Sequence, residues 1–145
     1  MADRSSYMTP SADLEEGEVV RASFAPDRKT YIRDHTWMAA LAMGVGMAIL
    51  WTIGNPHVWT GAVGGLLAVA IRAWYMLDEA LAERWDLTDR RLLGPGGRAI
   101  RLKDIKEVRT LDSAVQIVTL GGDKHLMKYQ PDRDATKARI DEARR

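Results

Sequence analysis

The residues best suited to catalysis or metal binding are three histidines, His35, His57 and His125. None has another His, Glu or Asp at the spacing expected of metal ligands, which predicts that the chain holds no metal. The sequence contains no cysteine, which excludes a thiol nucleophile, a disulfide and a thiolate metal site. The glycine-rich segment 94–97 is not followed by the Lys-Ser/Thr of a phosphate-binding loop, and Ser113 has no His or Lys beside it. We therefore expect a protein that is not an enzyme and that carries no cofactor.

Basic side chains are concentrated in residues 90–109, where seven Lys or Arg accompany only two acidic residues. The whole chain is nearly balanced, with 21 basic and 20 acidic residues and a net charge of +1. Cations beside a cytoplasmic leaflet attract anionic lipid headgroups, and the same cations could bind an acidic protein surface or form a solvated face. Aromatic residues are not interleaved with them, so nucleic acid is not an expected partner. The candidate lipid- or partner-binding residues are Arg90, Arg91, Arg98, Arg101 and Lys103.

The element expected to hold these cations near a membrane is the uncharged run that precedes them. No Asp, Glu, Lys or Arg occurs between Asp34 and Arg72. The run contains two apolar segments close to the length of about 20 residues that crosses a bilayer, and Gly54-Asn55-Pro56-His57 between them breaks the helix. Residues 37–77 are therefore predicted to form a transmembrane helical hairpin. The alternative is a buried hairpin of a soluble helical protein.

The aromatic and small residues of the hairpin predict its depth and its packing. Trp and Tyr prefer the two membrane interfaces, and the long side chain of Arg72 can reach the headgroups, although a functional charge within the membrane is the alternative. The predicted interface anchors are Trp37, Trp51, Trp59, Arg72, Trp74 and Tyr75.

Small residues four positions apart let helices approach closely, either within the hairpin or against another protein. The predicted helix-contact residues are Ala40, Gly44, Ala48, Gly61 and Gly65.

The charges that flank the hairpin predict its orientation. The loop at 54–57 has no Lys or Arg, whereas basic residues precede the first span and follow the second. The positive-inside rule then places both termini in the cytoplasm. His35 and His57 fall at span ends, which argues against their ligating a haem or pigment in mid-membrane. We expect no signal peptide, because the apolar run starts at residue 37 behind a charged segment and no small-residue cleavage site follows a short apolar region.

The remaining sequence predicts a tail and a small β-rich domain. Residues 1–17 have few apolar side chains and are expected to form a mobile N-terminal tail. Residues 18–36 combine a short cytoplasmic strand with a segment that approaches the membrane. Residues 78–145 predict a cytoplasmic domain of five or six short antiparallel strands in a strongly bent sheet or partly open barrel, closed by a helix over 132–143. Ala135, Ala138 and Ile140 are expected to face inward from that helix. The predicted fold class is an α+β membrane protein.

Two segments carry a resemblance to a known family. Trp85-Asp86-Leu87-Thr88-Asp89-Arg90-Arg91-Leu92-Leu93 resembles the hairpin that opens membrane-anchored bacterial pleckstrin-homology-like domains, and Ile100–Val108 is similar to the Ile-x-Leu-x-Asp-Ile segment that follows it. The order of a short strand, a two-span hairpin, strands and a final helix is also similar, over most of residues 18–143. The resemblance implies a pleckstrin-homology-like fold, a bacterial inner-membrane location and a non-enzymatic role, but no ligand. The family includes photosynthetic-complex assembly proteins, which are longer and have an additional span that this sequence does not show.

These observations favour an accessory or assembly subunit of an inner-membrane protein complex. The expected partner is an integral membrane protein complex, with anionic lipids and a second copy of the chain as further possibilities. The alternative is a peripheral reader of anionic lipid headgroups that uses the basic face of residues 90–109. An enzyme or transporter is disfavoured, because two spans with one charged residue make a poor transport path.

Overall fold

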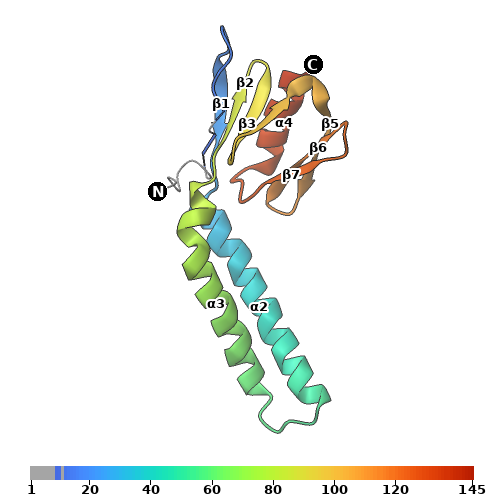
Figure 1. The fold of residues 1–145 in the computed structure, drawn as a ribbon. Helices are drawn as coiled ribbons and strands as arrows, with labels where there is room; N and C mark the ends of the chain where they lie inside the picture. Colours follow the sequence, from blue (N-terminus) through green and yellow to red (C-terminus); the bar gives the residue numbers. More distant parts are fainter. Residues whose placement is uncertain (1–8, 11) are drawn as a thin grey trace. The chain divides into compact units, whose positions relative to one another are not determined.

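The structure, a computed structural model, describes residues 9–10 and 12–145 and divides into two compact units (Figure 1). One unit is Tyr31–Asp78, and the other combines Glu79–Arg145 with the residues that precede Tyr31. Residues 1–8 and 11 of the predicted tail lie outside the described residues. Each unit is described by itself below.

The first unit consists of most of two helices, α2 (Arg28–Thr52) and α3 (Trp59–Ala82), and the turn between them. Both are long and apolar enough to cross a membrane. The chain turns between them at Gly54, whose φ of 75° suits glycine, and at Asn55, whose N–H donates to the carbonyl of Leu50 at 2.9 Å. At the other end of the pair, the hydroxyl of Tyr31 donates to the carbonyl of Ala73 at 2.7 Å. This hydrogen bond links the two helices at the end of the hairpin opposite the turn.

The second unit contains a four-stranded antiparallel sheet in the order β1-β2-β3-β4. Its strands are β1 (Val20–Phe24), β2 (Trp85–Thr88), β3 (Arg91–Gly94) and β4 (Arg98–Arg101). β1 lies far from β2 in sequence, yet Phe24 pairs with Trp85 at the end of their ladder. The turn between β3 and β4 uses Gly96 and Gly97 at φ of 70° and 75°, two successive left-handed residues that a tight hairpin turn requires.

A short 3₁₀ helix, η1 (Leu102–Asp104), interrupts strand pairing and leads into a second antiparallel sheet. Its strands are β5 (Ile105–Leu111), β6 (Ala114–Thr119) and β7 (Lys124–Met127), paired in that order. The α+β class is therefore confirmed, and residues 78–145 form six strands, within the predicted five or six, with β1 as the separately predicted strand. These strands form two sheets instead of the predicted single bent sheet or partly open barrel. The break at η1 explains the difference, because its turn takes the chain out of the first ladder.

One apolar core joins the two sheets to helix α4 (Arg133–Arg144). Trp85 and Leu92 contribute from the first sheet, Ile117 and Met127 from the second, and Ile140 from α4. The helix starts at Asp132, whose carboxylate accepts the N–H of Ala135 at 3.0 Å as a helix cap.

The inward face of α4 differs from the sequence prediction. Ile140 is buried as expected, but Ala135 and Ala138 are exposed, while Thr136 is buried and Ala143 is half-buried. Thr136 can occupy an inward position because its hydroxyl donates to the side-chain carbonyl of Gln130 at 3.1 Å. The hydrogen bond offsets the cost of burying a polar group, which hydrophobicity alone does not anticipate.

Candidate functional site

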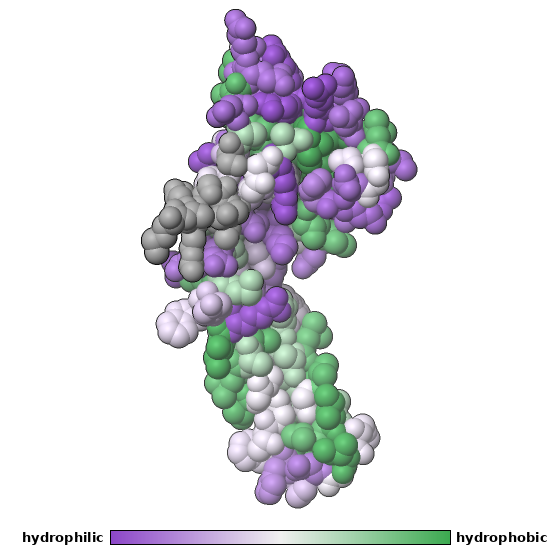
Figure 2. All heavy atoms as spheres, viewed as in Figure 1, coloured by the Kyte–Doolittle hydropathy of each residue, from purple (hydrophilic) through white to green (hydrophobic). Residues whose placement is uncertain are grey.

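Two surfaces of the chain are candidates for contact with partners. Apolar residues gather along α2 and α3, whereas hydrophilic residues dominate the visible face of the β-sheet unit (Figure 2). Exposed apolar side chains line the helices, among them Leu41 and Ile71. Patches of this kind mark a surface that lipid or another protein covers.

Glycines on α3 make the contact between the two helices. A Cβ added to Gly65 would lie 2.5 Å from the backbone carbonyl carbon of Ala42 and 2.7 Å from the backbone nitrogen of Met43. A Cβ added to Gly61 would meet the backbone of Gly46 in the same way. Two of the five predicted helix-contact residues therefore lie at the interface inside the hairpin, where only glycine lets the backbones come this close.

The other three predicted helix-contact residues point away from α3. Ala40, Gly44 and Ala48 are exposed, and nothing lies within 4 Å of a Cβ built on Gly44. The partners of Gly61 and Gly65 on α2 are instead Gly46 and Ala42. This face of α2 is rotated from the predicted one, because the small residues of α2 form more than one stripe. Ala40, Gly44 and Ala48, hereafter the outward stripe, are exposed and are not the residues that meet Gly61 and Gly65.

The predicted interface anchors are all exposed on the helices. Trp51 and Trp59 lie at the ends of α2 and α3 that flank the turn, whereas Trp37 lies nine residues after the start of α2 and Trp74 eight residues before the end of α3. Tyr75 and Arg72 are also exposed. The two tryptophans of each helix are therefore 14 or 15 residues apart, and Trp is enriched at both membrane interfaces.

Among the five candidate basic residues, Arg91 has an internal partner. Its Nε and Nη2 donate to the two carboxylate oxygens of Glu18 at 2.9 and 2.5 Å, and the Glu18 side chain is fully buried. The hydroxyl of Thr88 and the N–H of Glu15 also donate to this carboxylate. These bonds, above all those from Arg91, hold the pKa of Glu18 at about 2, below its ordinary value of 4.5, against the opposing effect of burial. The pair joins the start of β1 to β3, so the role of Arg91 is structural.

The described residues of the predicted tail make contacts with the domain. Pro10 forms a β-bridge with Pro95, the carbonyl of Asp13 accepts from Arg91 at 2.8 Å, and Glu15 lies 3.5 Å from Arg90. Two acidic residues of the predicted tail, Asp13 and Glu15, therefore contact arginines on β3 and on the β2–β3 turn. Composition alone gave no sign of these pairings.

The structure brings four of the candidate basic residues together and separates the fifth. Arg90, Arg91, Arg101 and Lys103 line one groove of about 430 Å³, hereafter the basic groove. Arg98 does not line it. Its charge instead acts with burial to lower the pKa of His125 on β7. Register explains the division, because Arg91 pairs directly with Arg101 across the β3–β4 ladder, whereas Arg98 pairs with Gly94 at the far end.

Sequence reasoning did not identify three other charged residues of the basic groove. Glu15 and Asp89 bring carboxylates to it, and Arg144 comes from the last turn of α4. Arg144 bonds to Asp141 and to the carbonyls of Ile105 and Lys106. Its position beside Arg101 depends on how α4 packs, for which the local sequence holds no signal.

The three histidines lie apart from one another. His35 is buried on α2, with its Nδ1 2.9 Å from the carbonyl of Tyr31, and His57 is exposed beside the turn. His125 is half-buried and meets Trp85 edge-on, with ring centroids 6.3 Å apart. Within the described part of the chain, no three His, Asp or Glu side chains gather as metal ligands would.

Comparisons of the chain with protein-family models, with curated proteins and with solved structures found no match.

Proposed function

We propose that this chain is a non-catalytic accessory or assembly subunit of an integral membrane protein complex. In this proposal α2 and α3 span a bacterial inner membrane, and the β-sheet unit is a pleckstrin-homology-like domain in the cytoplasm. The helices dock against other membrane helices, and the domain binds the cytoplasmic face of the same complex.

The observation that carries the proposal is the outward stripe on α2. Gly61 and Gly65 already supply the close contact inside the hairpin, so the hairpin does not need Ala40, Gly44 and Ala48 for its own packing. Small side chains on an exposed apolar helix permit the close backbone approach that drives helix association in lipid. A second membrane helix is therefore the partner that this face fits best.

The proposal requires both termini to face the cytoplasm. An alkaline phosphatase fused after Arg145, which is active only in the periplasm, should be inactive in intact bacteria, whereas a cytoplasmic fluorescent protein at the same position should be bright. The physical reason is the asymmetry of charge, since the 54–57 loop lacks Lys and Arg and both flanks carry them. An active phosphatase would place the domain on the opposite side and contradict this topology.

The docking role is tested by the size of the native assembly. Membranes from the source cell, solubilised in a mild uncharged detergent and separated by native electrophoresis, should show the chain migrating with a larger complex. Gly44→Leu should release it, because a bulky side chain on the outward stripe blocks close approach. Gly64→Leu is the matched control, since Gly64 on α3 also has open space around it and lies outside the stripe. A wild-type chain that migrates alone at its own mass would contradict the proposal.

A further inference from the structure

The basic groove extends beyond the candidate basic residues into two neighbouring hollows. It shares Asp89 and Ala143 with a hollow of about 480 Å³ on one side, and Leu102, Lys103 and Arg144 with a hollow of about 370 Å³ on the other. The three hollows therefore form a track around the C-terminal turn of α4. Their lining contains eight Lys or Arg and four Asp or Glu, so the track is basic but not uniformly so.

One part of the groove already holds an acidic peptide segment, which is the chain's own. Glu18 binds Arg91 through both carboxylate oxygens, the carbonyl of Asp13 binds the same guanidinium, and Glu15 pairs with Arg90. These arginines therefore bind carboxylate oxygens and main-chain carbonyl oxygens. The planar fork of Arg suits this kind of bidentate carboxylate contact.

Two cations in the same groove have no such partner. Arg101 and Lys103 are exposed, and neither side chain makes a hydrogen bond or an ion pair with any residue that the structure describes. They lie at the end of β4 and in η1, next to the arginines that the acidic segment occupies. The groove therefore has unpaired positive charge directly beside a bound acidic segment.

We propose that the basic groove binds a second acidic peptide segment, supplied by a partner protein, whose carboxylates pair with Arg101 and Lys103. An extended peptide fits a continuous track better than a single lipid headgroup does. The carboxylates of Glu15 and Asp89 in the lining also disfavour a densely anionic leaflet, whereas a peptide can place its charges between them. This inference rests on the proposed docking role, because the partner complex supplies the segment.

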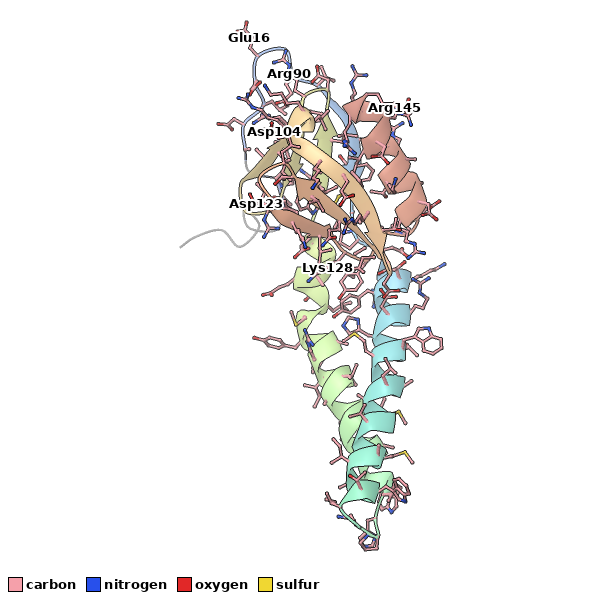
Figure 3. All side chains as sticks on the ribbon, turned by 90° about the vertical axis from the view of Figure 1, so that its right-hand side faces the viewer. Glu16, Arg90, Asp104, Asp123, Lys128 and Arg145 are labelled. Atoms are coloured by element: carbon pink, nitrogen blue, oxygen red, sulfur yellow. The ribbon has the colours of Figure 1, made fainter. Side chains whose placement is uncertain are left out.

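The test uses the full chain in uncharged detergent micelles and a fluorescein-labelled hexaglutamate peptide, with hexaglutamine as the probe control. Fluorescence anisotropy should show binding of hexaglutamate alone, and 0.5 M salt should weaken it by screening the exposed charges. Arg101→Gln with Lys103→Gln should weaken binding about tenfold, as the loss of two exposed ion pairs implies. Lys124→Gln with Lys128→Gln is the matched control and should change nothing, because these exposed residues line none of the three hollows. Figure 3 shows Lys128 at the other end of the domain from Arg90.

A variant that binds hexaglutamate more tightly adds a test that a folding defect cannot mimic, because a misfolded chain would lose binding. Glu15→Gln removes the carboxylate that competes for Arg90, so hexaglutamate should bind a few-fold more tightly. The proposal would be overturned if hexaglutamate does not bind, or if the groove variant and the control variant lose the same amount of hexaglutamate affinity. Binding only to vesicles that contain phosphatidylglycerol would overturn it in favour of a lipid reader. If the chain still migrates with its membrane complex in either case, the docking role stands and only the acidic-peptide inference fails.

Discussion

Replacing Arg91 with Met should lower the free energy of unfolding of the β-sheet unit by about 3 kcal/mol. The substitution leaves the fully buried Glu18 carboxylate without its counter-charge, and breaking a buried ion pair from one side typically costs about 3–5 kcal/mol. The lower end applies because the Arg91 side chain keeps 12% of its surface exposed, so water can approach the site. The backbone amides of β2 and β3, measured by hydrogen exchange on the full chain in detergent micelles, should exchange about a hundredfold faster.

The neighbouring arginine is the matched control. Arg90 is 46% exposed and lies 3.5 Å from an equally exposed Glu15, so Arg90→Met should cost less than about 1 kcal/mol. Replacing Glu18 by Leu together with Arg91→Met should recover part of the loss, because no uncompensated charge remains buried. If Arg91→Met is as mild as Arg90→Met, the Glu18–Arg91 pair contributes no more than an ordinary surface bridge.

The same pair predicts a specific acid sensitivity. Because the pKa of Glu18 falls from 4.5 in the unfolded chain to about 2 in the folded one, its contribution to stability is fully present above pH 4.5. That contribution is lost as the pH falls from 4.5 toward 2, where the folded state takes up the proton. Hydrogen exchange measured across this range should show the loss in the wild-type chain. In Arg91→Met the part of this destabilisation that comes from Glu18 should disappear, whereas the parts from Asp27 and Asp141, whose pKa values are also lowered, should remain.

Gly65→Leu should separate α2 from α3. The added side chain would overlap the backbone of Ala42 and Met43, and a backbone inside a helix cannot move aside as a flexible side chain can. Overpacking typically costs about 1–3 kcal/mol and sometimes more. The upper part of that range applies here, since the helices must part to accommodate Leu. The close approach that Gly61 and Gly65 permit would then be lost.

The chain's lack of cysteine makes this prediction simple to measure. Spin labels on cysteines introduced at Leu41 and Leu67, both exposed, would report the distance between the helices in lipid nanodiscs. Gly65→Leu should lengthen and broaden that distance. Gly64→Leu, one residue away and open to its surroundings, should leave it unchanged and add up to about 1 kcal/mol of helix propensity. An unchanged distance in both variants would show that the glycine contact does not hold the hairpin together.

The sequence by itself determined the elements that depend on local pattern. The charge-free run of residues 35–71 predicts two long apolar helices, because an exposed helix in water normally carries charge, and the structure has them. Gly96 and Gly97 predict the β3–β4 turn, because their conformations are ones that other residues rarely adopt. The sequence also predicts the C-terminal helix, because Pro131 suits a helix start, although two of its three predicted inward residues, Ala135 and Ala138, are exposed.

Only the tertiary structure decided which small and charged residues meet. Spacing of four residues occurs in several stripes on the helices, and packing alone selected Gly46 and Ala42 to face Gly61 and Gly65. The five basic candidates are equivalent in sequence, but strand register and the docking of residues 13–18 made Arg91 structural and set Arg98 apart. Arg101 and Lys103 were left facing the groove without partners. The side-chain contacts of Arg91 join residues more than seventy positions apart, and those of the helix pair join residues 15 and 23 positions apart, so no local pattern in the chain encodes them.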